Sequence, residues 1–349
     1  MRSLSGLRFV SMSTLHIFNP ETDYALATGR RQYTPPGPVR ELRRTLAALP
    51  AIWAEPGDAI LLLDDDAPAT PYLNLAGRRG VRVIKIADLQ NIEIDGVSPW
   101  GWNAALTSQL RRHSVATELL PGDEALRRLR ELAHRRLTIP FHKMMSTEGP
   151  LPVEIGSAEE LRKYLERHPD SYLKAPWSSS GRGVVHTLSM SADAVMRWGE
   201  GIMRRQGSVM AEVNQGRLLD FAAEWLCSGG EVEYQGLSVF RTNSVGRYEG
   251  NLSASEDELL AEVCRHGRFD VAVLDAQRRA LEELVAPNYD GPAGIDMLVR
   301  SDGSVNPCVE VNLRQTMGMA AQRLYRLTGR RQLFRPLAPE EFLGREDMA

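Results

Sequence analysis

The strongest structural signal in this chain of 349 residues is a β-hairpin predicted at residues 294–312. Two runs in which apolar and polar residues alternate, IDMLVR and NPCVEVN, flank the turn sequence SDGS. Alternation with a period of two indicates strands with one buried face, and a glycine-containing turn makes such strands antiparallel neighbours. The runs SVMAEV, FAAEWLC and YQGLSVFR, further upstream, are expected to extend an antiparallel sheet. The last third of the chain is therefore built on that sheet.

The first third has a different pattern, in which short apolar runs alternate with helical segments. Strands are predicted at residues 14–18, 59–63 and 81–86, the last two as buried strands, and an amphipathic helix is predicted at 38–49. Strand–helix–strand alternation is typical of an open, mostly parallel α/β sheet. The Gly-x-Gly-x-x-Gly turn of dinucleotide-binding folds is absent from this part of the sequence.

Between these two parts lies a small α+β unit that reads as helix, strand, loop, strand and helix. Ser157 followed by Glu160 forms a capping box at the start of its first helix, and Ser191 is expected to open its last helix. The predicted fold class is therefore α/β (α+β) with three units. These are an N-terminal parallel unit at 13–120, a central unit at 121–205 and a C-terminal antiparallel unit at 206–349.

Composition excludes several classes of function. A formal net charge of −3 gives no basic field for nucleic acid, and no apolar run approaches the roughly 18 residues of a membrane span. Three cysteines without CxxC spacing indicate a reducing compartment rather than a zinc site or a disulfide framework. The beginning of the sequence has no leader-like pattern, with translation expected to begin at Met1 or Met12, so a cytoplasmic location is expected.

Lysine is scarce, which makes each lysine informative. Only four of the 42 basic residues are lysines, and one of them, Lys174, lies in the apolar run SYLKAPW just before a Ser/Gly loop. Small residues let backbone N–H groups approach a phosphate, and a lysine on the adjoining strand supplies a compact positive charge. The alternative is an ordinary flexible hairpin with an incidental lysine. The candidate phosphate-binding loop residues are Ser178, Ser179, Ser180, Gly181 and Gly183.

Acidic and amide side chains on the predicted hairpin indicate a metal site. Glu310 and Asn312 are two residues apart and so share one face of their strand, which Asp296 can reach from the neighbouring strand. Two carboxylates and an amide oxygen are hard ligands of the type that Mg²⁺ prefers. The alternative is a solvated polar face, but the flanking residues are apolar, and a carboxylate on a mostly buried strand needs a partner.

Together these segments resemble the ATP-grasp superfamily, which includes D-alanine–D-alanine ligase, biotin carboxylase and glutathione synthetase. The resemblance covers roughly residues 140–318 and implies an ATP-grasp fold with a lid loop over the phosphates. It implies that Asp296, Glu310 and Asn312 hold two magnesium ions, with Mn²⁺ as the alternative metal. The run EVNLR at 310–314 is similar to the family signature E-[IV]-N-x-R, whose arginine, here Arg314, faces phosphate or substrate.

The same resemblance implies where the nucleotide lies. Lys143 looks like the earlier family lysine that reaches the phosphates, beside Lys174. Glu212, Val213 and Asn214 correspond to the hinge that reads adenine, and Asp220 to the acid on the ribose. For each acid the alternative is an exposed strand residue. Asn214 and the following glutamine depart from the usual aliphatic or aromatic hinge residues, so the nucleotide preference is left open.

A further departure concerns the substrate. D-alanine ligases carry an arginine two residues before the hairpin aspartate, whereas this chain has Gly294 there. Either Arg314 or Arg241 is then expected to clamp the phosphate, and a peptidoglycan function is not inferred.

Substrate determinants are expected in NPETDY at residues 19–24, directly after the first strand, where open α/β sheets bind ligands. Asn19, Glu21 and Asp23 could hold an amine there. The alternative is an Asn-Pro turn with local caps.

The resemblance implies an ATP- and Mg²⁺-dependent enzyme that activates a carboxylate as an acyl phosphate for attack by an amine. Two alternatives stay open: a kinase on the same scaffold, and a nucleotide-binding regulator without turnover. The expected partners are a small carboxylic acid and an amine, without nucleic acid or membrane. A homodimer is the commonest assembly for such enzymes.

Overall fold

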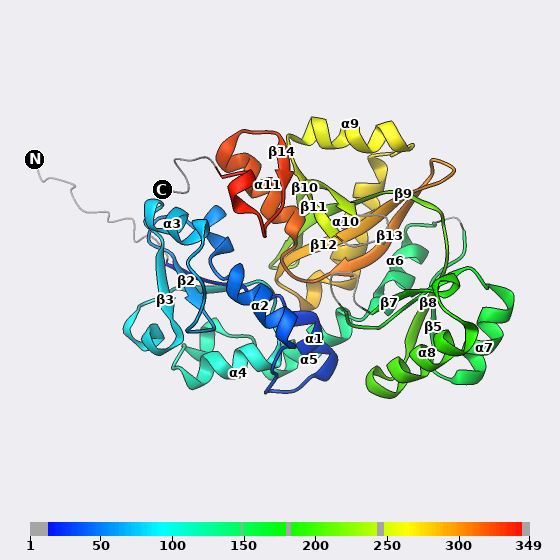
Figure 1. Cartoon of the computed structure of the whole chain (residues 1–349), viewed down its shortest axis with the longest axis horizontal. Coiled ribbons are helices and arrows are strands. Elements are labelled where there is room, and N and C mark those ends of the chain that lie inside the picture. Colours follow the sequence, from blue (N-terminus) through cyan, green and yellow to red (C-terminus); the bar gives the residue numbers. More distant parts are fainter. Residues whose placement is uncertain (1–12, 148, 179–182, 243–247, 344–349) are drawn as a thin grey trace, which may run out of the picture.

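The computed structural model describes residues 13–147, 149–178, 183–242 and 248–343. The expected start at Met1 or Met12 lies outside these residues. These described residues contain three β-sheets. Figure 1 shows a parallel sheet and a small unit at opposite ends of the molecule, with a larger sheet between them. None of the described helices is long and apolar enough to cross a membrane.

The N-terminal unit is a four-stranded parallel sheet of order β3-β2-β1-β4, which confirms the predicted parallel sheet. Helices cover both of its faces: Leu106 and Leu110 pack on one face, and Tyr72 packs on the other. The elements are β1 (Thr14–Ile17), α1 (Thr22–Thr28), α2 (Gly37–Thr45), β2 (Ala59–Leu62), α3 (Pro71–Arg78), β3 (Arg82–Lys85), β4 (Gly96–Pro99) and α4 (Ala104–Arg112).

One expectation for this sheet is wrong. β3 is an edge strand whose two end residues, Arg82 and Lys85, are exposed, whereas a buried strand was predicted there. An apolar run of four to six residues does not say how many neighbours a strand has, and the charged residues at both ends of β3 suit an edge.

The small unit is a four-stranded antiparallel sheet of order β5-β8-β6-β7 with two helices packed on it. The predicted capping box at Ser157 is present, and Ser191 caps the second helix. β8 pairs with both β5 and β6, so this sheet continues past the boundary expected at residue 205. The elements are β5 (Val153–Ile155), α7 (Ala158–Arg167), β6 (Ser171–Lys174), β7 (Val184–His186), α8 (Ala192–Gln206) and β8 (Val209–Val213).

The large sheet has the order β13-β12-β9-β10-β11-β14, and the hairpin predicted at 294–312 forms its first two strands. Two helices before the small unit, α5 (Asp123–Leu132) and α6 (Thr138–Met144), contribute Leu129 and Phe141 to the core of this sheet rather than to the small one. The elements are β9 (Arg217–Ser228), β10 (Glu231–Thr242), β11 (Tyr248–Ser253), α9 (Glu256–His266), α10 (Ala272–Leu284), β12 (Gly291–Arg300), β13 (Val305–Asn312), α11 (Met317–Thr328) and β14 (Gln332–Phe334).

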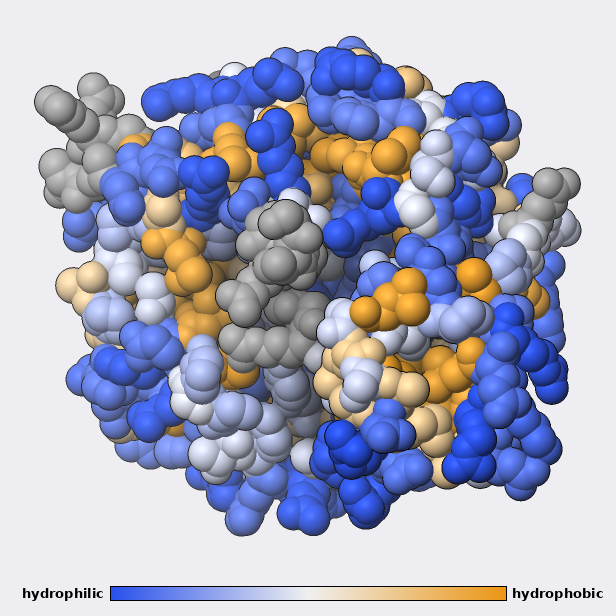
Figure 2. Space-filling view, turned by 45° about the vertical axis from the view of Figure 1, so that its right-hand side comes forward, coloured by the Kyte–Doolittle hydropathy of each residue, from blue (hydrophilic) through white to orange (hydrophobic). Residues whose placement is uncertain are grey.

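The ends of the described chain are packed together. Phe18 and Trp100 of the N-terminal unit share a core with Leu324 of α11 and Phe334 of β14, and the Tyr72 hydroxyl donates to the carbonyl of Pro336 at 2.8 Å. The large sheet is thereby fixed to the carboxyl ends of the parallel strands. On the face in Figure 2, hydrophilic residues surround several separate apolar patches.

Candidate functional site

A buried lysine–glutamate pair lies on the small sheet. β6 and β8 are antiparallel, with Lys174 opposite Met210 and Tyr172 opposite Glu212, so Lys174 and Glu212 project from the same face. Lys174 Nζ lies 2.6 Å from Glu212 Oε2, and the two side chains are only 10% and 12% exposed. The sequence resemblance thus selected two residues that the fold brings together.

The acidic pair lies on the hairpin of the large sheet. Asp296 on β12 is directly opposite Glu310 on β13, and Asn312 is opposite Gly294 two positions along, so the three polar side chains share a face. Burial raises the pKa of Asp296 well above its ordinary range, and the charges of Glu310 and Glu224 raise this pKa further. Two carboxylates held this way favour a cation between them.

Cys308 on β13 is affected electrostatically by both pairs. Its thiol is fully buried, and burial is the main cause of its raised pKa. The charges of Glu212, Asp296 and Glu310 raise that pKa further, whereas the charge of Lys174 lowers it. All four charged groups thus act on the pKa of one buried thiol of β13.

Arg135 joins the serine loop to the hairpin, a contact that the sequence analysis missed. It lies in the 3₁₀ turn Arg135–Leu137 before α6 and is 7% exposed. One terminal nitrogen donates to Ser178 Oγ at 3.0 Å, and the other donates to Glu310 Oε1 at 2.6 Å. A buried guanidinium thus lies between the predicted phosphate loop and the predicted metal ligands.

Arg314 connects the hairpin to the N-terminal unit. Its Nε donates to Asp23 Oδ2 at 2.8 Å and one terminal nitrogen donates to Asn312 Oδ1 at 2.8 Å. Both partners of the Arg314–Asp23 pair are less than one-sixth exposed. Asp23, predicted as a substrate residue, therefore lies beside the acidic hairpin although 291 positions separate the two residues.

The donor set suits a magnesium ion whose shell is shared with phosphate. Among residues 13–147, 149–178, 183–242 and 248–343, no three His, Cys, Asp or Glu side chains are grouped so as to hold a metal by themselves. Asp296, Glu310 and the amide of Asn312 supply hard oxygen atoms. Mg²⁺ commonly takes one or two carboxylates and completes its shell with water and substrate phosphates, which fits this set.

The start and end of the predicted phosphate loop are well defined. Ser178 is buried, and Gly183 has φ of +86° in the left-handed region. A Cβ on Gly183 would lie 2.8 Å from Ser178 Cβ, so the tight closure of the loop requires glycine. Ser179, Ser180 and Gly181 lie outside the described residues.

The predicted adenine residues lie at the end of β8 and directly after it, and the predicted ribose acid lies on β9. Asp220 is half-buried on β9, and burial raises its pKa. The positive charges of Arg217, 3.0 Å away, and of Lys174 lower this pKa in part. Asn214 instead donates to both carboxylate oxygens of Asp170, at 3.1 and 3.2 Å, so this side chain is already used in holding the strand end. Val213 is the last residue of β8 and pairs with Ser171 of β6.

The other predicted residues lie in different surroundings. Lys143 is exposed on α6, and Arg241 is exposed on β10. Asn19 is buried and exchanges two hydrogen bonds with the backbone of Gly101, which corresponds to the structural alternative. Glu21 is paired with Arg43 at 2.6 Å. Of the three proposed amine-binding residues, Asp23 is the one paired with Arg314, which in turn donates to Asn312 at the end of the hairpin.

Comparison with known proteins gives the fold. No family model and no curated protein matches the sequence. A solved Campylobacter jejuni biotin carboxylase–β-γ-ATP complex matches with a TM-score of 0.55 and 13% identity, over 92% of this chain and 72% of that one. The Staphylococcus aureus N5-carboxyaminoimidazole synthetase matches with a TM-score of 0.51 and 12% identity, over 92% and 78%. These are ATP-grasp structures. The chain has the ATP-grasp fold.

A third ATP-grasp structure is the biotin carboxylase domain of the Hydrogenobacter thermophilus 2-oxoglutarate carboxylase. It was crystallised as a dimer with MgADP, ADP and bicarbonate. It has a TM-score of 0.53 and 11% identity, and the match covers 96% of this chain and 72% of that one. Identities this low establish the ATP-grasp fold and leave the chemistry to the residues of this chain.

No signal in the sequence distinguishes Arg135. It precedes a second arginine in HRRL, but Arg-Arg pairs recur along the chain, for example at 43–44, 78–79 and 204–205. The scarcity of lysine drew attention to Lys143 instead. Both residues precede the small unit of the ATP-grasp fold, but only Arg135 is buried against Ser178 and Glu310.

Gly294 stands where D-alanine ligases have an arginine, and the packing shows what fills this place. Glu224 on β9 lies opposite Gly294, is 1% exposed, and accepts hydrogen bonds from Ser238 at 2.8 Å and Thr316 at 2.9 Å. A Cβ on Gly294 would lie 2.8 Å from Glu224 Oε2. A buried carboxyl group thus takes the space beside Asp296 in this chain.

Gly294→Ala is expected to destabilise the protein by about 1–3 kcal/mol, because the new methyl group overpacks against Glu224 and Thr316. Urea unfolding checks this. Gly77→Ala is the matched control: Gly77 lies within α3, nothing lies within 4 Å of its would-be Cβ, and a gain of roughly 0.5–1 kcal/mol is expected. Equal stability of the two variants would contradict the packing described for Gly294.

The pKa of Glu224 leads to a predicted pH dependence of stability. Burial raises its pKa from 4.5 to about 7, against the smaller lowering effects of Ser238 and Thr316. The folded state therefore binds the proton more tightly than the unfolded state does. Proton binding at Glu224 contributes on the order of 3 kcal/mol to the free energy of unfolding below pH 4.5, and this contribution is lost as pH rises through 7. Glu224→Gln, which mimics the protonated form, should remove this loss. Unfolding free energies at pH 5 and pH 8 test it, and identical pH slopes for both proteins contradict it.

Proposed function

We propose that this protein is an ATP- and Mg²⁺-dependent, ADP-forming ligase that joins a small carboxylic acid to an amine. The observation that carries the proposal is the bridge that Arg135 forms between the segment after Lys174, at Ala175 and Ser178, and Glu310 of the acidic hairpin. This bridge joins the Lys174–Glu212 pair to the Asp296–Glu310 pair. A cationic strand facing paired carboxylates is the arrangement that a metal–triphosphate needs. The ATP-grasp fold supports the proposal independently, because the solved structures it resembles include complexes with β-γ-ATP and with ADP.

Each part of the site has an assigned role in this proposal. Lys174 and Arg135 hold the phosphates from two sides, and Glu212 orients Lys174 at its 2.6 Å contact. Asp296, Glu310 and Asn312 would hold magnesium, which when bound offsets charge on the transferring phosphoryl group. In this proposal Arg314, which donates to Asn312, would bind the acceptor carboxylate, and Asp23, its ion-pair partner, would bind the amine. Lys143 stays a proposed phosphate contact that would require α6 or the loop to move.

The proposed reaction needs no side-chain nucleophile. An oxygen of the substrate carboxylate forms a bond to the γ-phosphorus of ATP, and the bond from that phosphorus to the bridging oxygen breaks, which releases ADP. The amine nitrogen then attacks the acyl carbon, and inorganic phosphate leaves as the amine loses a proton. Cys308 is excluded as a nucleophile in this proposal, because burial and three nearby carboxylates hold its pKa well above the ordinary value. Exclusion of water protects the acyl phosphate, a task for the Ser/Gly loop after Lys174.

Hydroxylamine trapping tests the proposal. The full chain is incubated with ATP, Mg²⁺ and pools of amino acids and small carboxylic acids, and ADP is measured with and without hydroxylamine. A ligase gives ADP together with a hydroxamate of the activated acid, and removal of Mg²⁺ with EDTA abolishes both. ADP release without a hydroxamate contradicts the ligase and indicates the kinase alternative. Nucleotide binding without ADP release from any pool indicates the regulator.

A further inference from the structure

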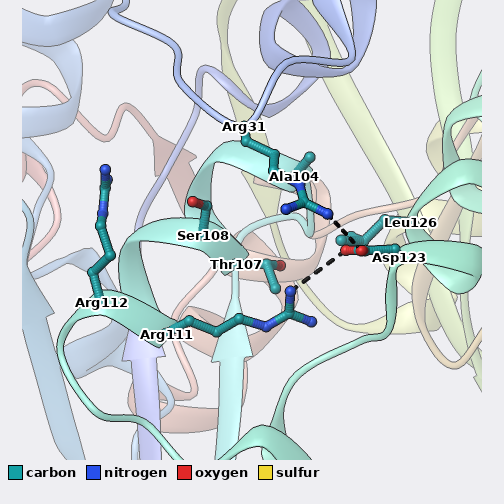
Figure 3. Close-up of a pocket in the computed structure, with 8 residues that line it drawn as sticks. All are labelled: Arg31, Ala104, Thr107, Ser108, Arg111, Arg112, Asp123 and Leu126. Carbon is teal, nitrogen blue, oxygen red and sulfur yellow. Dashed lines mark hydrogen bonds and ion pairs between the residues drawn. The ribbon is translucent and has the colours of Figure 1, made fainter.

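A second polar hollow lies in the N-terminal unit, between α4 and the start of α5. It has a volume of about 210 Å³ and is lined by Arg31, Thr107, Ser108, Arg111, Arg112 and Asp123, among others. Figure 3 shows Arg31 and Arg111 approaching the Asp123 carboxylate from two sides, with Thr107 near them on α4. None of these residues belongs to the site around Asp296 and Glu310.

The helix pattern explains why these side chains share one wall. Thr107 and Arg111, like Ser108 and Arg112, are four residues apart and so lie on one face of α4. Leu106 and Leu110 project to the other side, into the core under the parallel sheet. The sequence of α4 thus places hydroxyl and guanidinium groups together on the face that looks toward α5.

Two buried polar atoms of this wall lack a partner. Thr107 is 1% exposed, and neither its Oγ1 nor the Nε of Arg111 has a hydrogen-bond partner among the described residues. A buried donor left unpaired costs about 1–3 kcal/mol, so native proteins rarely keep two of them in one place. A ligand with several acceptor oxygens would satisfy both atoms at once after a shift of the surrounding side chains, because neither atom is accessible to solvent in this structure.

The charged groups that line the hollow indicate the charge of that ligand. Two arginines face one carboxylate: Asp123 accepts from Arg31 at 2.6 Å and lies 3.4 Å from Arg111. Arg112 also lines the hollow, with its side chain directed away from Asp123 in Figure 3. α5, which begins at Asp123, has no side-chain cap at Gly122, so its N-terminal N–H groups add positive potential. The donors outnumber the acceptors, and the lining favours an anion with more than two oxygens.

We propose that this hollow binds a phosphate group, supplied either by inorganic phosphate or by a small phosphate ester. Thr107 and Arg111 donate to it from α4, Arg31 donates from the loop after α1, and Asp123 is the intramolecular competitor for the same arginines. The site is separate from the ATP site and does not depend on the function proposed for it.

Calorimetric titration of the full chain with inorganic phosphate, without nucleotide or metal, tests the proposal. Saturable binding is expected. Thr107→Val should weaken it several-fold while leaving stability without phosphate equal or higher, because the variant removes an unsatisfied hydroxyl. Thr107→Ser should restore binding. Arg111→Lys, which keeps the charge but removes Nε, should weaken it roughly tenfold.

Asp123→Asn is expected to change the phosphate affinity in the opposite direction. Removal of the competing carboxylate should tighten phosphate binding, whereas a merely structural role for Asp123 would leave binding unchanged or weaken it. Arg78→Gln, an exposed arginine on α3, is the control for general loss of positive charge. A second titration with glycerol 3-phosphate distinguishes the two sources: tighter binding than that of inorganic phosphate indicates an ester, and weaker binding indicates the free ion.

Two outcomes would overturn the proposal. One is the absence of saturable binding to the wild-type chain. The other is binding that Thr107→Val and Asp123→Asn leave unchanged but Lys174→Met abolishes, since phosphate would then occupy the ATP site. Loss of ATP turnover with intact phosphate binding would instead count against the proposed ligase alone.

Discussion

Glu310→Gln is expected to lower ADP formation by roughly 10²–10³-fold while the protein stays folded. Glutamine keeps the volume of Glu310 but removes the charge that faces Asp296 across the hairpin and that would hold the magnesium ion. Its amide oxygen can still accept from Arg135, now 2.6 Å from Glu310 Oε1, so the contact to the serine loop weakens without disappearing. Steady-state ADP release at saturating ATP measures the effect, and circular dichroism verifies folding.

The matched control for this variant is Glu166→Gln, on the exposed surface of α7, which should leave turnover unchanged. A Mg²⁺ titration separates the causes: if Glu310 holds the metal, the Mg²⁺ concentration for half-maximal rate rises in Glu310→Gln. Full activity of the variant would remove Glu310 from the machinery and with it the proposed role of the hairpin.

Lys174→Arg is expected to weaken ATP binding by tenfold or more despite the conserved charge. Lys174 is buried on β6 and contacts Glu212, so a longer, planar guanidinium has to displace its neighbours. A fork of donors also presents its charge differently from a compact ammonium group. Equilibrium binding of a fluorescent ATP analogue measures the loss, and thermal unfolding reports the packing cost.

Lys163→Arg is the control for this second variant. Lys163 lies on α7, is 58% exposed and forms an i,i+4 pair with Glu159, an environment in which either basic residue is tolerated. Lys174→Arg with the nucleotide affinity of the wild type would show that the phosphates lie elsewhere than beside β6.

Much of the fold was predictable because it rests on local patterns. The parallel sheet followed from strand–helix alternation, the β12–β13 hairpin from its turn, and the helices that begin after Ser157 and Ser191 from their capping residues. Sheet membership was not predictable. β8 was expected to join the same antiparallel sheet as β9 and β10, yet it pairs with β5 and β6, because pairing depends on contacts distant in sequence.

The site was predictable where one strand or hairpin determines it. The facing of Asp296 and Glu310 follows from strand periodicity, and the Lys174–Glu212 pair was reached through family resemblance. Arg135 was missed because its importance arises only when the turn before α6 packs against β13, a contact between residues 175 positions apart. Whether Asn19 binds a ligand or a backbone could likewise not be decided until Gly101 was placed beside it.

The core shared by Phe18, Trp100, Leu324 and Phe334 bears on how the chain folds during synthesis. The hydrogen bond from Tyr72 to Pro336 spans 264 positions, so at about 5–20 residues per second the N-terminal unit waits roughly 13–50 s for its partner. Throughout that interval the carboxyl ends of the parallel strands lack α11 and β14. A nascent chain of this kind has a long exposure to aggregation and to chaperones, which a protein with a self-contained first domain avoids.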